Sequence, residues 1–345
     1  MNSTGVANRK GEVWAAGGAR AQRVISLVFT IVLQGFHRAV TIPEYDSNMK
    51  CDLHIHSRFS GPSTLPVLKA FCLESYSEPE EVYSVLKRRG MDVVTLTDHD
   101  SLDGCEALRA HADFFASEEV TCRMPSGTEA HIGVYDLNSR QHAEIQRRAN
   151  DLPALLAYLG EQELFYSVNH IFSSLTGPRN EEDFRWFVDS FPAFETLNGH
   201  MLPETNRHAA RLARRTEKVS LGGSDAHTTN AAATAYTEVP GAGNKEEFLA
   251  GLRRGFCRAR GSSGSYAQTT RVALRVVWEV LREERWAAVL APLAILIPAF
   301  TYGNFASEQL FARHWARRIV PRRRRRGSGR SLGASLRPAA MGKTS

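Results

Sequence analysis

The sequence predicts an α/β fold between residues 49 and 264, and three observations support this prediction. Short apolar runs alternate there with amphipathic stretches, a pattern typical of repeated β/α units. Hydrophobic residues make up 43% of the 345 residues, which is enough for the core of one large domain or two ordinary ones. Polar clusters follow most of the apolar runs. Because the carboxyl ends of parallel strands share one rim of such a fold, we expect these clusters to meet there.

The expected strands and helices follow one another in order along this region. A first strand begins at Met49 and leads into CDLHIHS. A helix is expected over residues 77–92, with Pro79 in its first turn and Gly90 as its stop. Further strands are expected at 93–97, 113–121, 131–137, 164–170, 193–199 and 219–223, with helices at 152–163 and 203–218.

The first 48 residues differ in composition from the region that follows. They contain a short apolar run, VISLVFTIVL at 24–33, behind two arginines. We interpret residues 1–48 as a non-conforming N-terminal extension, either a targeting segment or a consequence of a mis-assigned start, with Met49 as the true first residue.

Beyond residue 264 the sequence predicts a C-terminal extension in two parts. Residues 265–310 are expected to be helical and hydrophobic, and their stretch 286–305 has no charge and the length of a membrane span. Two prolines interrupt that stretch, so a helix packed on the main domain is the alternative to membrane association. Residues 311–345 are expected to form a basic disordered tail.

The net charge of +6 comes from the C-terminal residues. Residues 311–345 carry 11 Lys and Arg and no acid, which leaves 32 basic against 37 acidic residues in the rest of the chain. This argues against a broad nucleic-acid-binding face on the folded part, although the tail can attract nucleic acid or anionic lipid. Five widely spaced cysteines without a C-x-x-C pair indicate neither a disulfide framework nor a zinc ribbon, and they predict a cytoplasmic protein.

Half of the twelve histidines occur in short polar clusters, at His54, His56, His99, His131, His170 and His227. Along a strand, residues i and i+2 point to the same face, so His54 and His56 can reach one metal ion. Asp98, Glu119 and Asp225 are available to balance the charge of a divalent ion. A single histidine in such a cluster is usually a packed or exposed residue, but their joint occurrence predicts a metal site.

The stretch GGSDAH, residues 222–227, strengthens this prediction. Its two glycines allow close backbone approach. Asp225 and His227 then repeat the spacing of a carboxylate and an imidazole two residues apart at the end of a strand. A purely structural role does not account for this arrangement.

Five motifs occur in the order and spacing of one known family: DLHIHS, TDHD, EEVT with His131 downstream, SVNH and GGSDAH. Over residues 49–262 the chain therefore resembles the polymerase and histidinol phosphatase (PHP) superfamily. This resemblance implies a distorted (β/α)7 TIM-like barrel. It also implies two or three divalent ions, Mn, Zn or Fe, bound on the C-terminal rim of the barrel.

The resemblance also implies a ligand set. The implied ligands are His54, His56, Glu119 and Asp225 for a first metal, His131 and His170 with a bridging Glu119 for a second, and His99 and His227 for a third. Three-metal members carry another histidine soon after the first motif, where this chain reads RFSGPST. The third site is therefore expected to be weak, completed by Asp98, or absent.

Two neighbouring glutamates compete with Glu119 for the bridging position. Glu118 precedes it directly, and Glu129 lies in GTEAH. Glu119 is preferred because a β-branched pair follows it at a strand end and because this choice leaves His131 free as a separate ligand.

Further residues are expected to act on the substrate. His227 or Asp225 is expected to move a proton between the water and the leaving group, a role that competes with metal binding. Arg58 and Arg179 are candidates for cationic contacts to a phosphoryl group, and ordinary surface positions are the alternative for each. Asn198 and His200 are expected to line the pocket at the end of a strand.

The expected activity is metal-dependent hydrolysis of a phosphate ester, with a phosphorylated small molecule, nucleotide or short oligonucleotide as substrate. One alternative is an amidohydrolase-like cleavage of a carbon–nitrogen bond in the same pocket, which a site without arginine beside the metals would favour. A second alternative is a non-catalytic, metal-stabilised binding module. The sequence does not identify the substrate.

Overall fold

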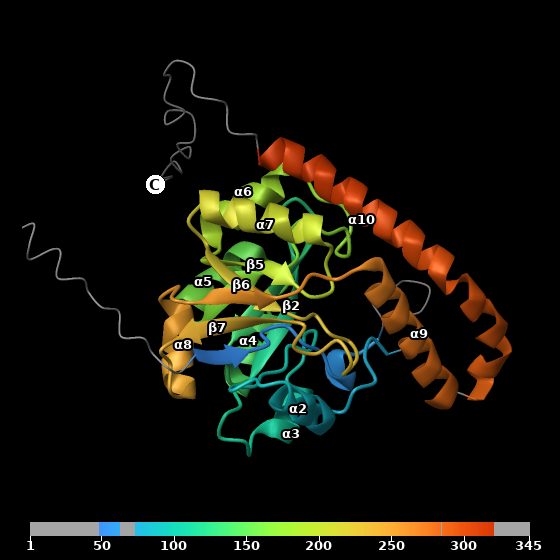
Figure 1. Cartoon of the computed structure of the whole chain (residues 1–345). Helices are drawn as coiled ribbons and strands as arrows, with labels where there is room; N and C mark the ends of the chain where they lie inside the picture. Colours follow the sequence, from blue (N-terminus) through green and yellow to red (C-terminus); the bar gives the residue numbers. More distant parts are fainter. Residues whose placement is uncertain (1–47, 63–72, 284, 321–345) are drawn as a thin grey trace, which may run out of the picture. The chain divides into compact units, whose positions relative to one another are not determined.

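The computed structural model describes residues 48–62, 73–283 and 285–320, which lie in one compact unit that begins at Asn48 (Figure 1). The predicted N-terminal extension falls almost wholly outside the described residues. The predicted tail does so from residue 321 onward.

Two sheets form the centre of this unit. The larger has the order β2-β3-β4-β5-β6. Its strands are β2 Ser117–Arg123, β3 Glu129–Tyr135, β4 Phe165–Val168, β5 Ala193–Asn198 and β6 Val219–Gly223. The smaller sheet has the order β1-β7-β8, with β1 Asn48–Cys51, β7 Ala235–Pro240 and β8 Arg258–Gly261. Five of the predicted apolar runs thus correspond to strands of the larger sheet.

The closed (β/α)7 barrel that we expected is not observed among the described residues. Strand β3 pairs antiparallel with both β2 and β4, and only β4, β5 and β6 are parallel. Between β6 and β2 the connection consists of isolated bridges, Ile55 to Ala226 and His99 to Glu119, instead of continuous strands. The fold is therefore α/β with an open, mixed sheet.

Side chains explain why the segments around Ile55 and residues 93–97 do not form regular strands. The backbone N–H of Ile55 donates to the Thr97 hydroxyl at 2.9 Å, and the N–H of His54 donates to the Asp52 carboxylate at 3.3 Å. The N–H of Ser57 donates to Asp98. Because polar side chains take up backbone groups that a β-ladder would use, the chain stays extended without a ladder.

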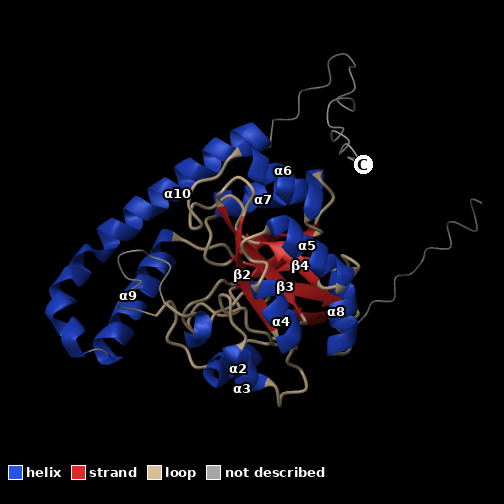
Figure 2. Cartoon of the chain, turned by 180° about the vertical axis from the view of Figure 1, so that it is seen from behind, coloured by secondary structure: helices blue, strands red, loops and turns tan. Residues whose placement is uncertain are grey.

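Helices cover the sheets, and α4 and α5 lie over the larger one (Figure 2). The helices up to residue 253 are α2 Pro79–Arg88, α3 Asp103–Leu108, α4 Ser139–Gln146, α5 Leu152–Glu161, α6 Glu181–Ser190, α7 Pro203–Arg215 and α8 Lys245–Arg253, with the short 3₁₀ helix η1 Arg58–Ser60. The apolar face of α5, Leu152, Leu155 and Leu159, packs in one core with strand residues such as Val134 and Val168. The predicted helix at 203–218 corresponds to α7.

The C-terminal part is helical, as predicted, and comprises α9 Tyr266–Glu283, the 3₁₀ segment η2 Arg285–Leu296 and α10 Ile297–Ile319. The boundary that we expected between residues 310 and 311 is wrong, because it falls inside α10. The physical reason is a buried face on this helix: Ala312 and Trp315 belong to the main core, and the Trp315 ring lies 5.3 Å from that of Phe184.

Several large apolar side chains of the C-terminal segment remain exposed. Val289 and Ile295 keep 76% and 82% of their accessible surface. Among the described residues, however, we find no helix with the length and apolar character needed to cross a bilayer. Association of residues 286–305 with a membrane stays a prediction.

Candidate metal centre

The structure brings together all six histidines of the sequence motifs around two carboxylates. They are contributed by consecutive segments of the fold. The members are His54 and His56 after β1, His99 at a bridge to β2, Glu119 in β2, His131 in β3, His170 after β4, and Asp225 and His227 after β6. We call this set, together with Glu74, the rim cluster.

Glu119 lies at the centre of the rim cluster and is buried. Its Oε2 atom lies 2.9 Å from Nε2 of His54 and 3.4 Å from Nε2 of His56. Its Oε1 atom lies 3.3 Å from Nε2 of His170 and 3.4 Å from Nδ1 of His131. The two oxygens of one carboxylate therefore face two different sets of imidazoles, which is the arrangement that a bridging ligand requires.

Glu118, the rival of Glu119, points away from the rim cluster. Its Oε2 accepts hydrogen bonds from Nδ1 of His142 at 2.8 Å and from the side-chain amide of Gln146 at 2.9 Å, both on α4. Successive side chains of a strand point to opposite faces, so only one of the two neighbours on β2 can face the histidines. Glu129 is exposed at the start of β3.

Asp225 forms the second carboxylate of the centre. Its Oδ1 lies 3.5 Å from Nε2 of His54 and 3.4 Å from Nε2 of His56, and its Oδ2 accepts a hydrogen bond from Asn198 at 3.0 Å. Asp225 has a positive φ of 52°, and its backbone N–H donates to the carbonyl of His54 at 2.6 Å. A Cβ on Gly223 would lie 2.3 Å from the Cβ of His54, so this close approach requires glycine, as the sequence predicted.

Glu74 is a member of the rim cluster that sequence reasoning missed. Its two carboxylate oxygens lie 3.3 Å from Nε2 of His99 and 3.4 Å from Nε2 of His227. His56, His99 and His227 form one group with metal-binding spacing. Glu74 therefore brings a carboxylate to this group, and nothing in the sequence around it marks it for this position.

Asp98, the residue we expected to complete a third site, does not join the metal-binding groups found among the described residues. Its Oδ1 accepts from the N–H of Ser57 and, at 2.8 Å, from the hydroxyl of Ser60, and its Oδ2 accepts from the hydroxyl of Ser57 at 2.6 Å. The carboxylate is fully used in holding the turn after His56. It is a positioning residue in this structure.

Outer partners fix the orientation of the first two imidazoles. Nδ1 of His56 is hydrogen-bonded to Ser60 Oγ at 2.9 Å, and because that hydroxyl donates to Asp98, the His56 Nδ1–H is the donor. Nδ1 of His54 lies 2.8 Å from Oε1 of Glu195, an acceptor that sequence reasoning missed. In both rings, Nε2 therefore faces the carboxylates and carries the lone pair whenever the ring is neutral, which is the orientation typical of metal-ligating histidine.

Glu195 also organises the next layer of the site. Its Oε2 accepts from the backbone N–H of His170 at 3.1 Å and from the side chain of Asn198 at 2.9 Å. Asn169 donates to Oε1 of Glu119 at 2.9 Å. A glutamate inside the apolar run AFETLN was a usable sequence signal, because buried carboxylates need partners.

Burial and neighbouring charges shift several pKa values in the centre. Burial opposes ionisation of Glu119, but the imidazoles around it, His54 first, hold its pKa well below the usual range. Burial likewise opposes protonation of His56, but the carboxylates of Asp225 and Glu119, both 3.4 Å from its Nε2, outweigh it and raise its pKa to about 10. Burial brings the pKa of His99 down to about 3. Ionisation of the buried carboxylates therefore depends on positive charge close to them.

The residues present fit divalent cations. Three buried ring nitrogens of the rim cluster have no hydrogen-bond partner among the described residues: Nε2 of His56, Nδ1 of His99 and Nδ1 of His170. Four overlapping groups of three side chains place ligand atoms within 4.8 Å of one another. Imidazole nitrogen with carboxylate oxygen is the donor set of zinc, manganese and iron sites. Which residues act as ligands, and how many ions bind, stays a prediction.

The residues predicted to bind substrate have different surroundings. Arg58 forms an ion pair with Glu78 and lies 3.7 Å from Glu283 of α9. Arg179 is buried and donates to the carbonyl of Glu129 and the hydroxyl of Thr176, so it supports the loop instead of facing the rim cluster.

The other two predicted substrate contacts do lie beside the rim cluster. The side chain of Asn198 donates to Glu195 and Asp225, and its carbonyl oxygen accepts from the N–H of His200 at 2.8 Å. The His200 ring lies 6.3 Å from that of His227. Asn198 is thus a support for two carboxylates, and His200 is an imidazole next to the centre that belongs to none of the metal-binding groups of the described residues.

The fold and the centre define a class: an α/β protein with buried histidine, glutamate and aspartate groups of metal-binding geometry. Comparison with known families adds that residues 203–257 match the family model described as PHP-associated. This segment runs from the start of α7 through GGSDAH to the residue before β8. The resemblance to PHP proteins that the motifs predicted is confirmed there.

Individual proteins are similar to part of this chain. The uncharacterized protein MJ1587 of Methanocaldococcus jannaschii is 41% identical over 84 residues, which are 24% of this chain and 48% of that protein, so the match spans about half of the relative. A two-domain protein from Bacteroides vulgatus, containing a predicted PHP-like metal-dependent phosphoesterase, is 18% identical with a TM-score of 0.49, over 64% of this chain and 67% of that one. PsfC from Pseudomonas syringae is 16% identical with a TM-score of 0.48, over 68% and 99%.

Proposed function

We propose that the protein is a metal-dependent hydrolase, and that its reaction is cleavage of a phosphate ester on a small molecule, nucleotide or short oligonucleotide. The observation that carries this proposal is the placement of Glu119, whose two oxygens face separate sets of imidazoles at 2.9 to 3.5 Å. A carboxylate shared in this way suits a site for two neighbouring ions.

Divalent ions held by the rim cluster would supply a water of lowered pKa and positive charge for the oxygens of the reacting phosphoryl group. The chain itself orients the ligand atoms. Ser60 and Glu195 hold His56 and His54, and Asn198 holds Asp225. Because these partners are themselves hydrogen-bonded and buried, the ligand positions are fixed before substrate arrives.

Proton transfer is assigned to the side chains beside Asp225. The Nδ1 atom of His227 lies 3.1 Å from the Asp225 carbonyl oxygen, and its Nε2 faces Glu74. If His227 binds a third ion, it cannot also donate a proton. His200 then acts as the base of this step, because burial lowers its pKa and keeps the ring neutral, and no ion pair joins it to a carboxylate of the cluster among the described residues.

Metal analysis combined with a hydrolysis screen tests the proposal. The full-length protein should contain Mn, Zn or Fe and should hydrolyse a generic phosphate monoester or diester, with nucleotides, sugar phosphates and histidinol phosphate as further substrates. The double change His54→Ala and His56→Ala should remove both metal and activity. A chain that binds these metals but cleaves no phosphate ester in the screen would exclude the phosphoesterase reaction.

One observation favours a second candidate, cleavage of a carbon–nitrogen bond. Among the described residues, the two central carboxylates, Glu119 and Asp225, form ion pairs with histidines and with no arginine or lysine. Phosphoryl substrates usually meet such cations in addition to metal ions. A screen of cyclic amides and N-acyl compounds on the metal-loaded protein distinguishes the two, since turnover of these compounds alone would select the amidohydrolase reaction.

A further inference from the structure

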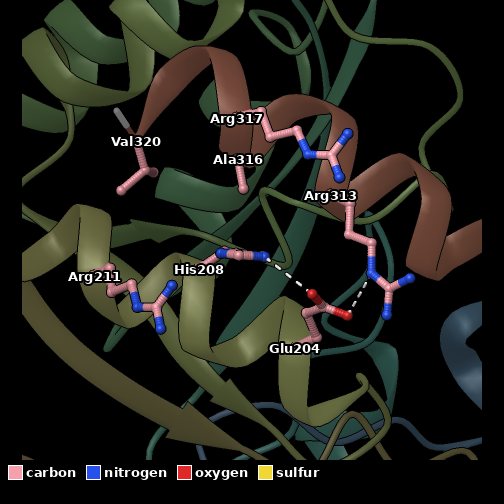
Figure 3. A pocket seen from close by; sticks show the side chains of 7 residues that line it. All are labelled: Glu204, His208, Arg211, Arg313, Ala316, Arg317 and Val320. Carbon is pink, nitrogen blue, oxygen red and sulfur yellow. Dashed lines mark hydrogen bonds and ion pairs between the residues drawn. The ribbon is translucent and has the colours of Figure 1, made fainter. Parts of the chain in front are cut away.

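A second charged site lies between α7 and α10 and has the opposite character to the rim cluster. A cavity of about 820 Å³ opens there, lined by Glu204, His208 and Arg211 from α7 and by Arg313, Ala316, Arg317 and Val320 from the C-terminal part (Figure 3). We call it the α7–α10 cavity. Its volume falls within the range of about 300–1,000 Å³ that is usual for small-molecule sites.

The charges that line the α7–α10 cavity do not cancel. Nε of Arg313 donates to Oε2 of Glu204 at 2.9 Å, so that arginine is compensated (Figure 3). Arg211 and Arg317 have no hydrogen bond or ion pair with any described residue. Two guanidinium groups, one from each helix, thus border the cavity and pair with no carboxylate of the described residues, because the one carboxylate in the lining, Glu204, is paired with Arg313. A ligand with two negative charges completes the balance.

A histidine adds a hydrogen-bond donor to the wall of the cavity. The side chain of His208 is 13% exposed, and neither of its ring nitrogens has a hydrogen-bond partner among the described residues. Its Nε2 lies 3.8 Å from Oε1 of Glu204, too far for a hydrogen bond, and its ring packs 5.8 Å from Phe172. Burial lowers the pKa of His208, so a neutral ring with one N–H is available for a ligand oxygen.

The same wall determines the chemistry of the ligand. Guanidinium groups bind the oxygens of phosphate and carboxylate through paired N–H donors. Ala316 and Val320 provide a small apolar surface beside them. Residues 203–257, which match the PHP-associated model, contribute Glu204, His208 and Arg211, whereas the other lining residues lie outside this match.

From this geometry we propose that the α7–α10 cavity binds a small organic phosphate in its dianionic form, held by Arg211, Arg317 and His208. This site is separate from the rim cluster, and the proposal does not depend on the reaction catalysed there.

Phenylphosphonate is the probe, because its carbon–phosphorus bond resists phosphoesterases and its phosphonate is dianionic at alkaline pH. Titration calorimetry on the full-length, metal-loaded protein should detect binding of phenylphosphonate. Benzenesulfonate, a monoanion of similar shape, should bind at least about tenfold more weakly than phenylphosphonate. In the double variant Arg211→Gln, Arg317→Gln, the number of phenylphosphonate sites should fall by one.

The double variant Arg214→Gln, Arg318→Gln is the matched control, since it removes the same charge from the same two helices outside the cavity. It should keep the wild-type number of sites. An equal loss in both variants would mean that only overall charge attracts the probe and would overturn the proposal. So would equal affinity for phosphonate and sulfonate, or binding of a single-stranded oligonucleotide at this site with no binding of phenylphosphonate. Arg211 and Arg317 are exposed, so both variants should fold, which circular dichroism checks.

Discussion

The rim cluster and the α7–α10 cavity are two charged regions whose side chains call for opposite partners. In the rim cluster, buried carboxylates and imidazoles face one another, and several ring nitrogens lack hydrogen-bond partners among the described residues. In the α7–α10 cavity, two of the lining guanidinium groups, those of Arg211 and Arg317, pair with no carboxylate of the described residues. The comparison teaches that burial and ring orientation indicate a cation site, whereas uncompensated arginines around a cavity indicate an anion site.

The largest expected effect comes from Glu119→Gln. An amide cannot supply two anionic oxygens to two sets of imidazoles, so metal content and hydrolysis should fall by at least about 100-fold, beyond the roughly 10–100-fold that removal of an outer partner costs. Inductively coupled plasma analysis and a phosphate-release assay measure both.

Glu118→Gln is the control for this change, because it alters the neighbouring buried residue on the opposite face of β2. It should leave metal content near the wild-type value. If Glu118→Gln removed the metal and Glu119→Gln did not, the assignment of the two faces of β2 would be wrong.

A smaller loss is expected from Asp98→Asn, which leaves every member of the rim cluster in place. The turn of Ser57 and Ser60 would lose charged acceptors, and the Ser60 hydroxyl would no longer hold His56 as firmly. Metal affinity should fall about 10–100-fold. Competition with a fluorescent chelator gives the affinity, and an unchanged value would show that Asp98 does not position His56.

The pH dependence of stability should differ between metal-free and metal-loaded protein. Without metal, interactions of protonated His56 stabilise the fold fully below its unfolded pKa of 6.5, and they are lost as pH rises toward the folded value of about 10. The melting temperature of chelator-treated protein should therefore fall across this window. A bound cation replaces the proton, so the metal-loaded protein should not lose stability there. If melting temperature fell equally with pH in the metal-free and metal-loaded protein, protonation of His56 would not be linked to stability in this way.

The smallest effect is expected from Arg58→Ala. Unlike Arg211 and Arg317, Arg58 already has a carboxylate partner, Glu78, and that pair is partly exposed. Exposed pairs contribute about 0–1 kcal/mol, so unfolding free energy should change little. KM for a phosphate ester should also stay within about twofold, since Arg58 has no contact with the rim cluster. A large rise in KM would restore its predicted substrate role.

Much of the metal centre could be predicted from the sequence because several of its residues lie only two positions apart along the chain. Extended backbone places His54 and His56 on one face whether or not a ladder forms, and both do face Glu119 and Asp225. The glycines of GGSDAH likewise indicated the close approach seen between Gly223 and His54. The choice of Glu119 over Glu118 depended on which face of β2 is turned inward, and only the packed structure gives that.

Other features could not be predicted because they join distant segments. Glu74 reaches the histidines from a part of the chain with no marked spacing, and Asp98 is used by two serine side chains that precede it by about 40 positions. Pairing between β6 and β2 is also reduced to isolated bridges, and there side chains accept from the backbone N–H groups of His54 and Ile55.

The sequence by itself determined the order of β/α elements and the identity of the histidines and of the GGSDAH carboxylate, because periodicity and short spacings act locally along the chain. The tertiary structure decided which carboxylates face those histidines and which of the described arginines pair with a carboxylate. Those outcomes depend on how β2, α7 and α10 pack against the rest of the fold, because the charged groups that meet there are far apart in the sequence.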